Sequence, residues 1–200
     1  MIGVVCPVCV SKCGYRRISD YIREVRELWP FRVGWVSVSR FQCRGAPGRL
    51  PTFSMLPYQL VPYCRYTLGT MVHALLMWRE FWKDPQKSGT AYEVAEKLET
   101  AAYGESGVTS WRLTCWALIF RSWLRRAQSE LAREYDFSSV QFHDRLPSIL
   151  DELYGYLGVL SRGPPVSWAA VAVCVREYGT RTGRFLLGVP SQGRRGALKE

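Results

Sequence analysis

Cysteine spacing near the N-terminus is the first feature of this sequence that could support chemistry. Cys6 and Cys9 stand two residues apart in a CPVC motif, and this spacing lets two thiolates turn toward one Zn²⁺ ion. A tetrahedral site needs two further ligands, for which Cys13 and Cys43 are the candidates. We therefore expect a zinc site made of Cys6, Cys9, Cys13 and Cys43, although Cys43 has no partner in a second C-x-x-C pair. The alternative is that these cysteines pack as small apolar side chains without metal.

Basic charge is concentrated in the same region. The 200-residue chain holds 27 Lys and Arg against 17 Asp and Glu, a formal net charge of +10. Residues 1–66 have 10 basic and 3 acidic side chains, a balance of +7, whereas 67–130 and 131–200 balance at +1 and +2. Such a local surplus favours an acidic partner such as DNA. Arginine supplies 22 of the 27 cations. This excess suits bidentate contacts to phosphate and guanine; the alternative explanation is a GC-rich coding sequence.

Composition narrows the class of protein. With 48% hydrophobic and 14% aromatic residues, the chain has the make-up of a globular protein rather than a disordered one. The longest uncharged apolar stretch, 163–175, is too short to span a bilayer, so no membrane partner is expected. Residues 1–5 lack the regions of a secretory signal. We therefore expect a cytoplasmic, reducing location in which the seven cysteines are thiols or metal ligands.

The secondary structure that positions these residues is predicted to change from β-containing to helical near Pro62. Before it, we predict a β-containing module over residues 1–66, with a short helix from Ser19 to Trp29 closed by Pro30, a strand from Phe31 to Phe41, and a loop over 45–51. The helix prediction rests on the apolar residues of 19–29, which fall at helical spacing.

After Pro62 the apolar periodicity is helical. We predict helices over 67–83, 90–103 and 109–126, with Thr67, Thr90 and either Thr109 or Ser110 as N-caps and Gly104 just past the end of the second. Two weaker helices are expected near 147–157 and 165–178. The predicted fold class is mainly α: a small degenerate zinc ribbon, a helical domain over 67–180, and a flexible basic tail over 181–200.

Five short segments of the N-terminal region occur in an order typical of one family. They are Cys6–Cys9, Gly14–Arg17, Arg40–Arg44, Thr52–Pro57 and Leu60–Tyr66. Together they resemble the N-terminal zinc-ribbon domain of bacterial insertion-sequence transposases and related transposase-like proteins, over residues 4–80. The resemblance implies a zinc ribbon, DNA binding and a helix-turn-helix region that follows. The chain departs from the pattern at Cys13, where a His is usual, and at the incomplete knuckle of Cys43.

The helical segment 67–126 has the helix lengths of a trihelical helix-turn-helix. In such a motif the N-terminal residues of the last helix reach base edges, which here would be Thr109, Ser110 and Arg112. Cations further along that helix, or in the N-terminal module, would contact phosphates; these candidates are Arg121, Arg125, Arg126, Arg16, Arg17, Arg40, Arg44 and Arg49. The alternative is an ordinary helical bundle with solvated arginines.

These observations favour a DNA-binding, transposase-associated or mobile-element-derived protein without its own catalytic domain. The carboxylates that might hold metal ions for phosphoryl transfer fall in predicted helix or loop rather than in strands; they are Asp136, Asp144, Asp151 and Glu152. His73 lies inside an apolar helix, and no phosphate-binding loop motif occurs. The alternative is a helical protein-interaction or oligomerisation module with a structural zinc site, acting as a homodimer or with a transposase partner. A third, weaker hypothesis is an enzyme fragment.

Overall fold

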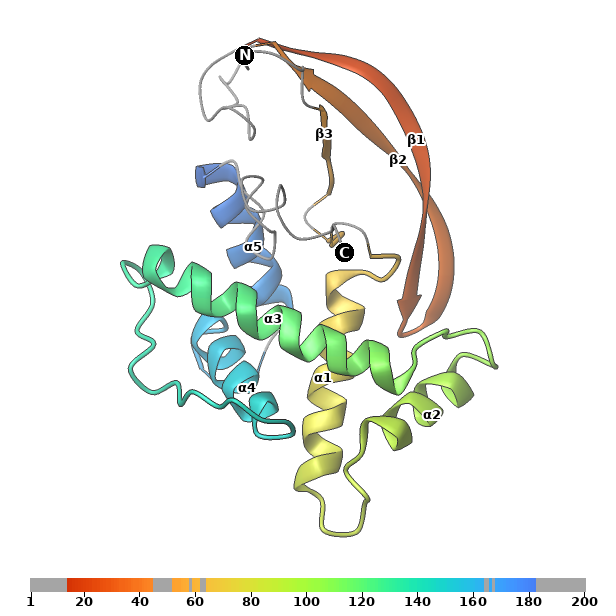
Figure 1. Cartoon of the computed structure of the whole chain (residues 1–200), viewed down its shortest axis with the longest axis vertical. Helices are drawn as coiled ribbons and strands as arrows, with labels where there is room; N and C mark the ends of the chain where they lie inside the picture. The colour runs from red at the N-terminus through yellow and green to blue at the C-terminus, as the bar shows by residue number, and fades with distance from the viewer. Residues whose placement is uncertain are drawn as a thin grey trace, which may run out of the picture.

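Two long antiparallel strands and a bundle of helices make up this protein, whose computed structural model describes residues 14–44, 52–57, 59–61, 64–163, 166 and 168–182 (Figure 1). The elements are β1 (Tyr15–Leu28), β2 (Phe31–Cys43), β3 (Thr52–Met55), α1 (Leu68–Lys83), α2 (Ala91–Ala101), α3 (Ser110–Leu131), α4 (Ile149–Leu160) and α5 (Trp168–Thr182). The expected mainly α class is wrong, because the strands dominate the N-terminal region. The architecture is mixed α/β.

The segment predicted as a short helix forms most of strand β1. Ser19 to Leu28 pairs residue by residue with Arg40 to Phe31 of β2, so the helix prediction for 19–29 is wrong. Its apolar residues are spaced for a helix, but a cross-strand ladder more than ten residues long outweighs local periodicity. The strand predicted over Phe31–Phe41 is confirmed as part of β2.

β1 and β2 form an arched two-stranded ribbon, called here the ribbon (residues 15–43), which curves over one side of the helices (Figure 1). The pairing register shifts between Arg17 and Ser19, and such a bulge strengthens the twist of the bulged strand. The tip of the ribbon is fastened to α1: the Leu28 N–H donates to Thr70 Oγ1 at 3.3 Å, and the Trp29 ring lies edge-on to His73.

β3 extends the sheet at the other end of the ribbon, in the order β1-β2-β3. Tyr15, Phe41 and Phe53 gather on one face there, with ring centroids 5.4–5.7 Å apart. Because side chains alternate along a strand, the opposite face carries Gln42, which is cross-strand from Thr52. This end of the sheet is therefore aromatic on one side and polar on the other.

Threonine caps start the first three helices where the sequence predicts them. Thr67, Thr90 and Thr109 each accept the backbone N–H of the residue three positions on, as expected of N-caps. The second helix ends at Ala101 with Ala102 as its C-cap, and the N–H of Gly104, at φ +81°, closes its last turn on the Glu99 carbonyl. α4 and α5 confirm the two weaker helices.

One core joins the ribbon tip to the helices. Leu28 and Val61 belong to the same buried cluster as Leu68, Phe120 and Tyr156, which come from α1, α3 and α4. Burial raises the pKa of the Tyr156 phenol to about 12. Within the described ranges, no helix has the length and apolar character needed to cross a membrane. The predicted tail lies outside the described residues, apart from the end of α5.

Candidate nucleic-acid interface

The ribbon has a surplus of positive charge that the helices lack. Residues 14–44 hold seven arginines and three carboxylates, a balance of +4. Residues 64–163, which carry α1–α4 and are called here the helical body, hold twelve cations and twelve carboxylates and balance at zero. The N-terminal surplus seen in the sequence is thus presented on an extended, two-stranded surface.

Three of the predicted phosphate contacts meet on one face of the ribbon. Arg40 and Gln42 share that face because side chains alternate along β2, and Arg16 is cross-strand from Gln42. Arg44 directly follows β2, and its N–H continues the pairing by donating to the Gly14 carbonyl at 3.0 Å. Arg16 Nε donates to Gln42 Oε1 at 3.0 Å, and Arg40 Nη2 donates to Thr52 Oγ1 at 3.4 Å. All three arginines are exposed. We call this surface the arginine face (Arg16, Arg40 and Arg44).

The guanidiniums of the arginine face have no carboxylate partner among the described residues. In the part of the chain that the structure describes, none of the three forms an ion pair with a carboxylate. The hydrogen bonds of Arg16 and Arg40 go to neutral amide or hydroxyl oxygens, which orient these two guanidiniums and leave other N–H donors available. Oriented, uncompensated guanidiniums on an exposed sheet are suited to phosphate oxygens.

Arg17 and Arg49 differ from the arginine face. Arg17 pairs with Asp20 through its Nε, at 2.9 Å from Oδ1, and through a second, close guanidinium contact. The hydrogen bond from Arg17 lowers the pKa of Asp20, so this carboxylate stays ionised and offsets its partner. Arg49 lies outside the described residues.

A polar network joins the ribbon to the N-terminus of α3. Arg26 Nη1 donates to the Glu105 carbonyl at 2.9 Å, and the Tyr66 hydroxyl donates to the Ser106 carbonyl at 2.7 Å. Arg112, at the start of α3, donates to the Tyr66 hydroxyl at 3.0 Å and also bonds the Gly107 carbonyl. We call these residues the junction network (Arg26, Tyr66, Glu105–Gly107 and Arg112).

The junction network places the predicted base-reading residues beside the ribbon. Thr109 caps α3 by accepting the Arg112 N–H at 3.2 Å, and Ser110 is the first helical residue. The Arg112 guanidinium lies over the Tyr66 ring, 5.5 Å from its centroid, and is already engaged. Sequence reasoning did not foresee Tyr66 or Arg26, because their partners lie about 40 to 80 residues away along the chain.

The three predicted phosphate contacts on α3 have different environments. Arg125 makes a bidentate pair with the buried Glu152, at 2.6 and 2.7 Å, and Arg121 donates to the His143 carbonyl at 2.7 Å. Both guanidiniums also lie within 4 Å of the Asp144 carboxylate. Arg126 is exposed and bonds only the Ser122 carbonyl of the preceding turn among its described contacts. Of the three, Arg126 is the most accessible to a phosphate.

The predicted zinc ligands are mostly outside the described residues. Cys6, Cys9 and Cys13 fall there, whereas Cys43 is fully buried at the end of β2. Among the described residues, no group of three or more His, Cys, Asp or Glu side chains is arranged to hold a metal ion. The four-cysteine zinc site therefore stays a prediction, and no step proposed below depends on it.

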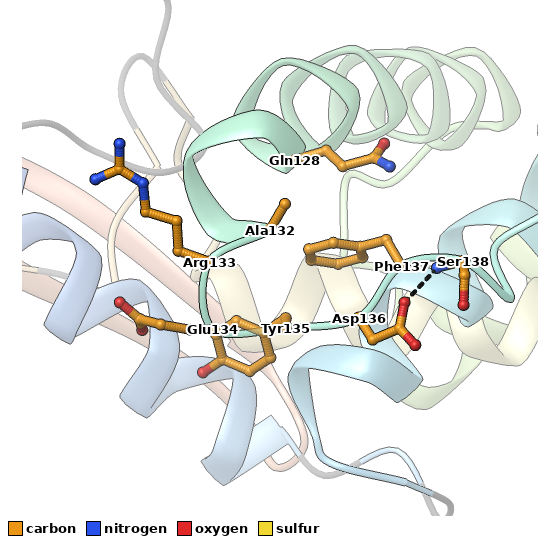
Figure 2. A pocket seen from close by; sticks show the side chains of 8 residues that line it. All are labelled: Gln128, Ala132, Arg133, Glu134, Tyr135, Asp136, Phe137 and Ser138. Atoms are coloured by element: carbon orange, nitrogen blue, oxygen red, sulfur yellow. Dashed lines mark hydrogen bonds between the residues drawn. The ribbon is translucent and has the colours of Figure 1, made fainter.

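The hollow shown in Figure 2 lies beside the end of α3, with a volume of about 560 Å³. It is open to solvent and lined by Gln128 and the segment 132–138. Asp136 accepts the Ser138 N–H at 2.9 Å, while Arg133 and Glu134 point away from Phe137 (Figure 2). Its lining offers neither a cysteine nor a histidine, so Ser138 has no imidazole base beside it in this hollow.

Three of the four carboxylates that might hold metal ions contact cations, and the fourth, Asp136, accepts a backbone N–H. Glu152 holds Arg125, and Asp151 receives Arg79 Nε and Lys83 Nζ, each at 2.8 Å. Asp136 caps its own turn. His73 of α1 stacks edge-on against Trp29, and burial lowers its pKa. These contacts stabilise the helical body and give no catalytic constellation among the described residues.

Comparison with known proteins adds no assignment: the chain matches no protein-family model, no curated protein and no solved structure at a significant level. Function is therefore argued from the charge and geometry of the ribbon.

Proposed function

We propose that this protein binds DNA through the ribbon. One observation carries the proposal: the ribbon region balances at +4 and the helical body at zero, with three exposed arginines on one face. Phosphate contacts by Arg and Lys supply most of the affinity of sequence-independent DNA binding. A surface that concentrates such contacts will define how the protein lies on the duplex.

The shape of the ribbon supports the same proposal. The major groove of B-DNA admits either an α-helix or a two-stranded β-ribbon, and several DNA-binding proteins insert strands into a groove. β1 and β2 pair over more than ten residues and curve away from the helices at mid-length (Figure 1). The arginine face lies toward the end of the ribbon that is remote from the helical anchor at Leu28.

α3 contributes secondarily in this proposal. Ser110 in its first turn and the exposed Arg126 toward its C-terminal end are available, whereas the Arg112 guanidinium is engaged by Tyr66 and Gly107. Arg121 and Arg125 are used inside the helical body, so we leave them out of the proposed surface. The ordered resemblance to transposase ribbons supports a mobile-element role for the protein as an accessory DNA-binding factor.

The test compares two triple variants that change the net charge equally. One removes the arginine face by Arg16→Ala, Arg40→Ala and Arg44→Ala. Its matched control removes three exposed cations of the helical body that form no ion pair among the described residues, by Lys97→Ala, Arg133→Ala and Arg145→Ala. Anisotropy of a labelled random duplex is measured at about 50 and 200 mM salt.

We expect the ribbon variant to bind the duplex at least about 10-fold more weakly. The slope of log affinity against log salt concentration should fall in magnitude by about 3, because this slope reflects the number of phosphates that the protein neutralises. The control should change affinity by less than about 2-fold. Equal losses in the two variants would show that only net charge matters. Absence of salt-dependent binding by the unaltered protein would overturn the proposal.

A further inference from the structure

The ribbon also exposes apolar side chains that phosphate binding does not explain. Trp35 is 67% exposed, Ile22 64% and Val33 44%. All three belong to one face: Trp35 is cross-strand from Glu24, and Ile22 and Val33 take the adjacent positions on that face, cross-strand from Ser37 and Arg26. We call this surface the Trp35 stripe (Ile22, Val33 and Trp35).

The Trp35 stripe is not part of the protein core. The opposite face of the same ribbon supplies the buried side chains Val25 and Val38, and Arg23 there donates to the Val61 carbonyl at 2.6 Å. Leaving a tryptophan and two β-branched side chains partly in water forgoes a share of the roughly 1.5–3 kcal/mol that full burial of one large apolar side chain contributes to folding. A contiguous exposed apolar surface of this kind commonly marks a binding site.

Charge around the Trp35 stripe favours a polyanion. Glu24, the cross-strand neighbour of Trp35, is held by Arg26 at 2.6 Å and by the exposed Arg65 at 3.8 Å. Its pKa is lowered, first by the hydrogen bond from Arg26. Two guanidiniums therefore share one carboxylate beside the exposed indole, and Asp20 on the same face is offset by Arg17. The stripe is apolar at its centre and cationic at its margin.

We infer that the Trp35 stripe binds unpaired bases of single-stranded DNA, with Trp35 as the stacking platform. The inference rests on the proposed DNA-binding function. Single-strand binding surfaces combine aromatic side chains, on which bases stack, with cations that follow the backbone. An unpaired base offers its π-face without cost, whereas a duplex would first have to be unstacked. Arg65, whose side chain is 68% exposed, is the cation available to a phosphate beside a base on Trp35, whereas Arg26 is held by Glu24 and the Glu105 carbonyl.

The test measures binding of the full chain to a labelled oligo(dT) of about 20 nucleotides and to a duplex of equal length. Three variants are compared with the unaltered protein: Trp35→Ala, Trp35→Phe and, as control, Tyr92→Ala, which removes an aromatic side chain that is 70% exposed on α2. Circular dichroism checks that each variant is folded, and light scattering reports its oligomeric state.

We expect Trp35→Ala to weaken oligo(dT) binding about 10-fold, since one stacked base contributes roughly 5- to 100-fold in affinity. Trp35→Phe should retain most of the binding, and duplex affinity and Tyr92→Ala should change by less than about 2-fold. Equal weakening of oligo(dT) and duplex, or no weakening of either, would overturn this inference while leaving the arginine face untouched. Dissociation of a dimer by Trp35→Ala, without loss of oligo(dT) binding, would assign the stripe to a second copy. Failure of the unaltered protein to bind either probe would overturn both proposals.

Discussion

The arginine face of the ribbon and the paired arginines of the helical body use the same side chain in opposite ways. In the helical body, Arg79 and Arg125 are paired with Asp151 and Glu152 at 2.6–2.8 Å, from elements distant in sequence. On the arginine face, Arg16 and Arg40 bond only neutral oxygens among the described residues. The same side chain stabilises a fold where carboxylates surround it and is available to a polyanion where they do not. Charge density alone therefore identifies a binding surface less well than the pairing of each cation.

The substitution Glu152→Ala in the helical body tests this contrast and should have the largest effect on stability. Glu152 is buried and accepts both guanidinium donors of Arg125 and the His143 N–H at 2.8 Å. We expect a loss of about 3 kcal/mol in the free energy of unfolding, because the substitution leaves buried donors without an acceptor. Urea denaturation measures it.

Asp144→Ala is the matched control for Glu152→Ala. The Asp144 carboxylate is 89% exposed and lies 3.6 Å from Arg125, so its loss should cost less than about 0.5 kcal/mol. If both substitutions cost the same, the helical body does not depend on its buried pair, and the comparison with the ribbon fails.

An intermediate effect is expected at the junction network, where the two regions meet. Tyr66→Phe removes one hydroxyl that donates to the buried Ser106 carbonyl and accepts from Arg112. The cost should be about 1–2 kcal/mol, measured by thermal or urea unfolding. Trp29→Phe, at the exposed tip of the ribbon, serves as control and should cost less. An unchanged stability in Tyr66→Phe would mean that the Tyr66 hydroxyl does not stabilise the start of α3, and would leave the Arg26–Glu105 hydrogen bond as the polar link to the ribbon.

A smaller effect on the stability of the helical body is expected from the charge of Asp151, and it should depend on pH. Burial tends to raise the pKa of Asp151, but hydrogen bonds from Lys83 and Arg79 outweigh it and the pKa is lowered. A carboxyl whose folded pKa lies below its unfolded value of about 3.9 stabilises the protein above that pH and loses this contribution as the pH falls through the folded pKa.

Asp151→Asn should therefore cost about 1 kcal/mol at pH 7, and the difference from the unaltered protein should shrink below about pH 4. Urea titrations at several pH values measure it. A difference that stays constant from pH 7 to acid would show that the charge of Asp151 is not what stabilises α1 against α4.

The smallest effect on stability is expected on the arginine face. Arg40→Ala removes an exposed guanidinium with no ion pair among the described contacts, so stability should change by no more than about 0.5 kcal/mol. Thermal unfolding tests this, with the unaltered protein measured in parallel. A loss comparable to that of Glu152→Ala would make Arg40 a structural residue and remove it from the proposed DNA surface.

Features set by a few neighbouring residues could be predicted from the sequence. Thr67, Thr90 and Thr109 cap their helices through bonds to N–H groups three residues away, an interaction local enough to be read from residue order. The strand from Phe31, the five helices, and the concentration of positive charge in the N-terminal region were equally accessible.

Features that depend on distant partners required the tertiary structure. The apolar spacing of 19–29 suits a helix, and only its ladder with β2 makes it a strand, because cross-strand pairing supplies contacts that helix periodicity does not anticipate. The partner of Arg125 lies 27 residues away, and that of Arg26 lies 79 residues away. The sequence by itself determined where the charge and the helix starts lie; the tertiary structure decided which arginines are neutralised, because ion pairing depends on proximity in space.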